Sequence, residues 1–178
     1  MTLATHAVVG GSVAVLFPSH PVVAFFVGFF SHFILDAIPH WGYKIHSAYV
    51  KPGETVSIDS IASGFWGKIK ADKYFGLDLC HTGVDVLLGV FLAFILWMPV
   101  TLEQLQILSL GIFGGVLPDF LTFVYARFPH QPFIFINNFH RYIHADKNVF
   151  ENNPFMGILT QVVVAACVVV SCVFLIQL

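Results

Sequence analysis

The chain has 178 residues, of which 57% are hydrophobic and only 10% charged, and its formal net charge is -2. Soluble domains carry about 25% charged residues, so this composition excludes an ordinary water-soluble protein and indicates a membrane protein. The slightly negative charge argues against binding to nucleic acid, whose phosphates are neutralised by clustered Lys and Arg. We therefore expect a single integral membrane domain over residues 1–178.

Five apolar stretches predict an all-α fold, a polytopic membrane helix bundle of about five helices, since a spanning helix needs about 20 apolar residues. These stretches cover about residues 4–17, 22–38, 78–97, 102–127 and 155–176. The first two are short, so this pair could instead be a helical hairpin that only dips into the bilayer. The last is nearly all Val, Ala, Cys, Phe and Leu, and we expect it to be a plain anchor.

Two polar segments, about 39–77 and 128–153, separate the predicted helices. If all five helices span, both segments and the N-terminus lie on one side of the membrane. This side holds all eight basic residues: Lys44, Lys51, Lys68, Lys70, Lys73, Arg127, Arg141 and Lys147. Positively charged loops stay in the cytoplasm, so we expect this face to be cytoplasmic.

Histidine and aspartate side chains gather toward the same predicted face. The candidate metal ligands are His6, His32, Asp36, His40, His81, Asp85, Asp119, His140 and His144. His32 and Asp36, like His81 and Asp85, are four residues apart, which places both side chains of each pair on one helix face. Imidazole and carboxylate ligands suit Zn, Mn or Fe. Because nine groups exceed the need of one ion, we expect two or three ions, as in two-metal hydrolytic sites.

The energy of charged groups in a membrane also favours a metal. A carboxylate in the middle of a membrane helix costs roughly 3 kcal/mol on insertion scales. Gathering Asp36, Asp85 and Asp119 would add mutual repulsion. Divalent cations would remove both penalties. The alternative without metal is a hydrogen-bonded polar cluster that lines a hydrated vestibule.

Two motifs, Thr5-His6-Ala-Val-Val-Gly10 and Gly114-Gly-Val-Leu-Pro118-Asp119, resemble those of the bacterial inner-membrane family of membrane-bound metal-dependent hydrolases. That family is similar in pattern to the zinc-dependent phospholipase C and single-strand nuclease superfamily. The resemblance implies a three-zinc cluster with His6 as an early ligand, Asp119 as an isolated carboxylate and the two H-x-x-x-D pairs as paired ligands. The family's H-R-G-x-T-H-S segment is replaced here by His140-Arg141-Tyr-Ile-His144.

We therefore expect a membrane-embedded metal-dependent hydrolase of a bacterial inner membrane, a phosphoesterase that acts on a lipid-borne or membrane-adjacent phosphoester at the cytoplasmic face. The candidate catalytic residues are Asp119, His140 and His144, and Arg141 is expected to bind substrate phosphate. One alternative is a transition-metal transporter or non-hydrolytic metal-binding membrane protein, although a carrier needs ligands near the membrane midplane. Another is an inactive scaffold that binds a partner through the 39–77 loop.

Overall fold

The computed structural model describes residues 1–43 and 75–178, apart from residues 129, 146 and 151. Within these residues the regular secondary structure is entirely helical, which confirms the predicted all-α class. The helices are α1 (Leu3–Ala14), α2 (Pro21–Asp36), α5 (Phe75–Trp97), α6 (Leu102–Arg127), α7 (Phe133–Ile143), the short 3-10 helix η1 (Lys147–Phe150) and α8 (Pro154–Ile176). Most of the predicted 39–77 loop lies outside the described residues.

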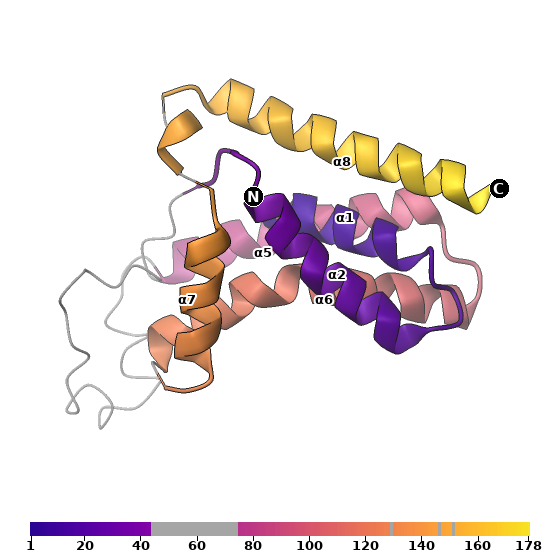
Figure 1. The fold of residues 1–178 in the computed structure, drawn as a ribbon, viewed down its shortest axis with the longest axis horizontal. Helices are drawn as coiled ribbons and strands as arrows, with labels where there is room; N and C mark the ends of the chain where they lie inside the picture. The colour runs from indigo at the N-terminus through magenta and orange to yellow at the C-terminus, as the bar shows by residue number, and fades with distance from the viewer. Residues whose placement is uncertain (44–74, 129, 146, 151) are drawn as a thin grey trace.

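Three of these helices, α5, α6 and α8, are long and apolar enough to cross a membrane. The remaining pair is shorter, with 12 residues in α1 and 16 in α2. At about 1.5 Å per residue these helices are about 18 and 24 Å long, less than the hydrocarbon core of about 30 Å. Figure 1 shows these five helices lying roughly along the long axis of the molecule, with α7 crossing them at one end. The structure is thus a membrane helix bundle that encloses a short helical hairpin.

We call the end of the bundle that holds the start of α1 and the end of α2 the near end, and the opposite end the far end. At the far end the buried core is apolar and includes Ala14, Ala24 and Leu108. The indole Nε1 of Trp97 donates a hydrogen bond to Ser12 there, with an N···O distance of 2.9 Å. The buried histidines and carboxylates described below lie toward the near end.

Glycine residues bring α6 unusually close to α1 and α2. A Cβ atom added to Gly115 would lie 2.5 Å from the carbonyl oxygen of His6, and one added to Gly10 would lie 2.6 Å from that of Gly111. Gly28 of α2 meets the same Gly111 backbone. Small residues allow this close backbone approach between membrane helices. The glycines therefore set the distance between the three helices that carry His6, His32 and Asp119.

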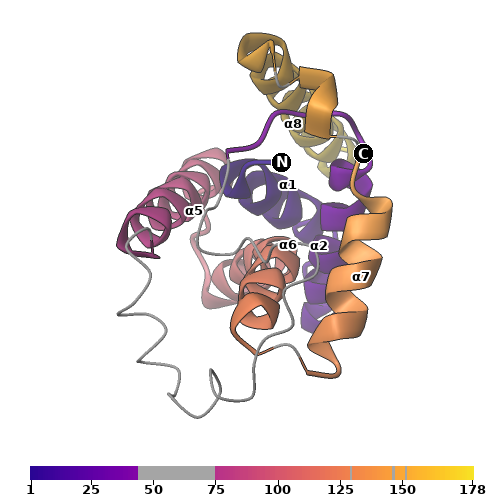
Figure 2. The same ribbon diagram turned by 90° about the vertical axis from the view of Figure 1, so that its left-hand side faces the viewer.

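The polar segment predicted for 128–153 contains a helix, which the sequence alone did not establish. This helix, α7, covers His140 but ends at Ile143, so His144 lies just beyond it. Asn137 and His140 are its buried residues. Figure 2, which views the bundle from the near end, shows α7 beside α2 at the edge of the bundle. The helix is short and amphipathic, so its few apolar residues are interspersed with polar ones and form no apolar run in the sequence.

Candidate metal centre

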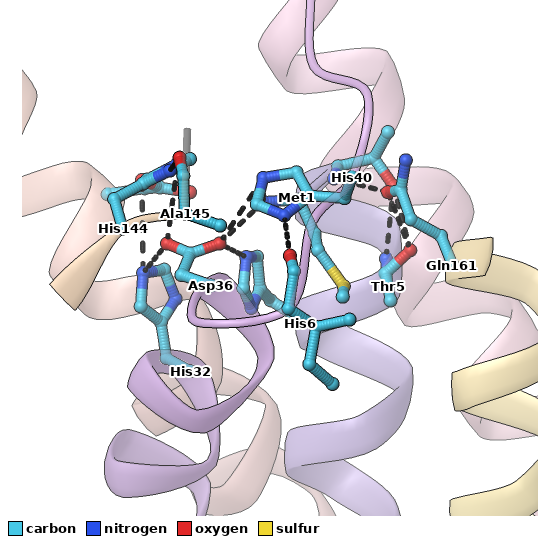
Figure 3. A network of polar contacts seen from close by, with 12 residues as sticks. Met1, Thr5, His6, His32, Asp36, His40, His144, Ala145 and Gln161 are labelled. Carbon is cyan, nitrogen blue, oxygen red and sulfur yellow. Dashed lines mark hydrogen bonds and ion pairs between the residues drawn. The ribbon is translucent and has the colours of Figure 1, made fainter. Parts of the chain in front are cut away.

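Asp36, the last residue of α2, is the centre of the polar cluster, and its side chain is only 1% exposed. Five imidazole rings direct Nε2 at its carboxylate. The distances from Nε2 to a carboxylate oxygen are 3.2 Å for His6, 3.1 Å for His32, 3.7 Å for His40, 2.7 Å for His140 and 3.9 Å for His144. Figure 3 shows the side chains of His6 and His32 meeting Asp36 from two helices.

The two oxygens of Asp36 face different partners. Oδ2 faces His32, His140 and His144, and Oδ1 faces His6, His40 and the amino group of Met1, which lies 2.6 Å away. Two groups of side chains have ligand atoms within 4.8 Å of one another and could hold a metal ion: His32, Asp36, Asp119 and His140, and Asp36, His40 and His144. Asp36 belongs to both groups, so it could bridge two ions.

The outer nitrogen, Nδ1, of four of the histidines is held by a defined partner. The Nδ1 atoms of His32, His40 and His144 donate to the backbone carbonyls of Gly115, Ile38 and Ala145 at 2.8, 2.7 and 3.0 Å. His140 Nδ1 lies 3.0 Å from the hydroxyl of Thr122, which itself donates to the carbonyl of Pro118. Metal-ligating histidines are oriented in this way, with the outer N–H on a carbonyl and the inner nitrogen free for the metal.

These contacts fix the tautomer of the neutral rings. A carbonyl oxygen only accepts, so Nδ1 of His32 carries the proton and Nε2 of the neutral ring is an acceptor. That acceptor faces Oδ2 of Asp36 at 3.1 Å and Nε2 of His140 at 3.2 Å. Lone pairs facing one another at these distances repel. Either extra protons or a cation must lie among them, and the donor set fits a divalent cation.

The surroundings of His6 also fit a cation in the cluster. Its ring is fully buried and stacks on His32 with a centroid distance of 3.9 Å. Neither ring nitrogen makes a hydrogen bond to any residue that the structure describes. Burying polar atoms without hydrogen bonds is costly, and a metal ion at Nε2 would remove that cost for this one nitrogen. The cluster therefore satisfies its buried nitrogens better with a cation than without one.

The protonation of His40 also suits a metal ligand. Burial, followed by the positive amino group of Met1, lowers the pKa of His40 from 6.5 to about 4. The ring is therefore neutral at physiological pH. Histidine must be neutral to bind a metal. The Nε2 atom of His40 lies 2.7 Å from the amino group of Met1, so a metal at this nitrogen would replace that contact.

Solvent reaches the cluster mainly at one residue. The side chain of Asp119 is 31% exposed, compared with 14% for His144 and 1% for Asp36. Its Oδ1 lies 3.9 Å from Nε2 of His32 and 3.8 Å from that of His140. Asp119 thus joins the first of the two ligand groups to solvent. Arg141, the predicted phosphate-binding residue, follows His140 and is exposed.

The second H-x-x-x-D pair lies outside this cluster. His81 is exposed, and neither His81 nor Asp85 belongs to the two ligand groups. The carboxylate of Asp85 instead accepts from the backbone N–H groups of Leu3 and Ala4, at 2.7 and 3.2 Å, and from the hydroxyl of Tyr43 at 3.0 Å. Burial and the nearby Asp85 raise the pKa of Tyr43, so its hydroxyl stays protonated as a donor. Asp85 therefore holds the first turn of α1 in place.

Sequence reasoning missed two residues that support the site. Thr122, which positions His140, follows Asp119 by three residues, so the helical spacing could have placed both on one face. Gln161 accepts from the backbone N–H of Thr2 at 2.8 Å and donates to the carbonyl of Trp41 at 2.7 Å. It is the one amide side chain of α8, and a polar residue in an apolar membrane helix is itself a signal of function.

Comparison with known proteins assigns no family. No protein-family model, no curated protein and no solved structure matches the chain.

Proposed function

We propose that the chain is a membrane-embedded metal-dependent hydrolase, a phosphoesterase that acts on a lipid-borne or membrane-adjacent phosphoester at the cytoplasmic face of a bacterial inner membrane. The observation that supports this proposal is the convergence of five imidazole Nε2 atoms on the single buried carboxylate of Asp36. A purely structural zinc is closed by four ligands and often uses thiolates. A larger cluster of His and Asp with one bridging carboxylate favours a two-metal hydrolytic site.

In this proposal Asp36 and the histidines around it would hold two zinc-type ions, with Mn or Fe as alternatives. His32, Asp119 and His140 would hold one ion, and His6 and His40 would hold the other, while His144 would serve as the acid. Ions held here would supply Lewis-acid activation of water and of a phosphoryl oxygen.

The more exposed side chains take the remaining roles. Asp119 is the most exposed of the cluster, and it orients the attacking water. His144, also partly exposed, protonates the leaving group, while His140 is kept in register by Thr122. Arg141 is exposed next to His140 and binds phosphate oxygens, for which its guanidinium is suited.

The position of the ligands favours an enzyme over a metal carrier. A carrier needs ligands near the midplane and access from both faces. Among the described residues, the far end offers Ser12 as its buried polar side chain, and this side chain is already bonded to Val8 and Trp97. A route for an ion across the far end would have to cross the apolar core around Leu108.

The test is metal analysis of protein purified in detergent without chelators, followed by a hydrolysis screen on phospholipid vesicles. Wild-type protein is expected to hold two or more equivalents of a transition metal. Asp36→Asn, which preserves side-chain volume, and His32→Ala combined with His140→Ala should lose most of it. The matched control, His20→Ala combined with His130→Ala, removes two exposed histidines and should retain it.

The outcomes separate the candidate functions. Metal-dependent release of a phosphorylated headgroup, abolished by chelator and restored by Zn, would support the hydrolase. Bound metal with transport of Zn into vesicles but no hydrolysis would support the carrier. Absence of metal, with no uptake when Zn or Mn is added, would reject both.

A further inference from the structure

The helix α7 has two distinct faces. Asn137 and His140, three residues apart, are buried against the bundle. Phe135, Phe139 and Tyr142 follow the spacing i, i+4, i+7, so they share another face, and their exposed fractions are 67, 43 and 88%. Three large aromatic side chains on one exposed face of an 11-residue helix need a nonpolar environment.

The connections of α7 place it at the membrane face. It follows α6 and precedes α8, two helices that are long and apolar enough to span. Figure 1 shows that it runs across the ends of the bundle helices instead of along them. In the end view of Figure 2 it lies at the edge of the bundle, beside α2. Its outward side is therefore level with the membrane boundary and turned away from the protein.

The aromatic face of α7 continues an apolar surface of α2. Val22, Phe26, Phe30 and Ile34 recur every four residues along α2 and are 68, 48, 56 and 68% exposed, as expected for a row that faces lipid. The neighbouring Phe33 contacts Phe139 of α7 with a ring-centroid distance of 5.1 Å. Phe139 in turn stacks with Phe135 at 6.4 Å. Phe29 contacts both Phe30 and Phe33, so a chain of ring contacts joins the exposed row of α2 to the aromatic face of α7.

We propose that α7 is an interfacial helix that inserts Phe135, Phe139 and Tyr142 into the same bilayer, at the boundary between acyl chains and headgroups. Aromatic side chains are enriched at this depth, and amphipathic helices lie there with their apolar face in the lipid. Arg141 flanks the aromatic face and is exposed, so its long side chain can reach lipid phosphates. The occupant of this surface is lipid because the surface is continuous with the lipid-facing row of α2.

This inference deepens the proposed function, on which its chemical consequence rests. The opposite face of α7 supplies His140, whose Nε2 lies 2.7 Å from Asp36. The candidate metal centre is therefore separated from lipid by one helix, a width of about 10 Å. A phosphoester carried in a lipid headgroup lies at that depth, so the substrate class is a headgroup phosphoester.

The insertion is tested by spin-label accessibility in the full-length protein, reconstituted in phosphatidylcholine and phosphatidylglycerol vesicles. Cys80, Cys167 and Cys172 are first replaced by Ala, and a nitroxide is then attached in turn to Phe135→Cys, Tyr142→Cys and Arg141→Cys. Phe91→Cys, on the exposed surface of α5, serves as a reference within the membrane. Collisions with oxygen report lipid, and collisions with chromium oxalate report water.

We expect the ratio of oxygen to chromium accessibility at 135 and 142 to be severalfold higher than at 141 and lower than at 91. Chromium accessibility at 135 and 142 that equals or exceeds that at 141 would overturn the inference, because the face would then lie in water. Labels closed to both reagents would also overturn it, because protein would then cover the face. If one variant fails to fold, the other still decides the outcome. The measurement needs neither metal nor turnover. If the hydrolase proposal is rejected, the inferred substrate class is rejected with it, but the insertion of α7 can still be confirmed.

Discussion

The two H-x-x-x-D pairs have the same spacing but different surroundings. In α2, His32 and Asp36 are buried where glycines draw α6 close and where α7 adds His140. In α5, His81 is exposed and Asp85 binds the first turn of α1. Helical spacing places both members of each pair on one face. The comparison teaches that the neighbours of that face decide whether it can hold a metal.

The largest expected difference between the pairs is in metal affinity. Asp36→Asn should weaken Zn binding by more than about 100-fold, since losing even an outer partner of a ligand costs about 10–100-fold. Asp85→Asn should leave the affinity unchanged, because Asp85 contacts backbone N–H groups and Tyr43. Competition with a chelating dye measures both. Equal losses would mean that both pairs bind metal.

The two pairs also differ in how tightly a neighbouring glycine is packed. Gly115→Ala would press a Cβ against the carbonyl oxygen of His6, whereas nothing lies within 4 Å of a Cβ at Gly83, between His81 and Asp85. Overpacking typically costs about 1–3 kcal/mol, so Gly115→Ala should lower the free energy of unfolding by that amount. Gly83→Ala should raise it by up to about 1 kcal/mol, because alanine favours helix. Unfolding titrations in mixed detergent would show that the two substitutions change the free energy of unfolding in opposite directions. Equal changes would contradict the packing described.

The role of Asp85 predicts a smaller, local effect. Asp85→Ala removes the acceptor for the N–H groups of Leu3 and Ala4. Loss of such a helix-terminal acceptor typically costs about 1 kcal/mol. Hydrogen exchange of these two amides should therefore quicken, while His81→Ala leaves them unchanged. Unchanged exchange in Asp85→Ala would show that the carboxylate does not stabilise α1.

The lowered pKa of His40 predicts a pH dependence of stability in chelator-treated protein. The pKa of His40 is about 4 in the folded protein, compared with about 6.5 in an unfolded chain. Between these values the unfolded chain binds a proton that the folded ring does not, so stability falls as the pH drops from 6.5 toward 4. His40→Gln should flatten this part of the stability curve, and His81→Gln should not. Equal slopes in both variants would contradict the assignment.

The long helices could be predicted from sequence because their apolar runs are uninterrupted. The predicted stretch 102–127 coincides with α6, and 155–176 differs from α8 by one residue. Pro118 does not end α6, since membrane helices tolerate proline where neighbours satisfy the backbone. Counting crossings also placed His6, Asp36 and Asp119 at the same end of the bundle, as the structure has them.

The surroundings of the site could not be predicted in the same way. The contact of Asp85 with the start of α1 joins residues 82 positions apart, and no local pattern encodes such a contact. The short apolar face of α7 is hidden among polar residues, and the position of His140 depends on Thr122 in another helix. Spacing within one helix can be read from sequence, whereas the choice of neighbours comes from tertiary packing.

The contacts of Gln161 join the last helix of the chain to the first, which bears on how the protein assembles during synthesis. Through this side chain, α8 binds the backbone of Thr2 at the start of α1 and that of Trp41 after α2. The ribosome makes α8 after the other described helices, and His140 and His144 precede it only shortly. The contacts between α1, the segment after α2 and α8 can therefore form only after α8 has been synthesised. A product that stops before α8 would leave the backbone N–H of Thr2 and the carbonyl of Trp41 without their Gln161 partner.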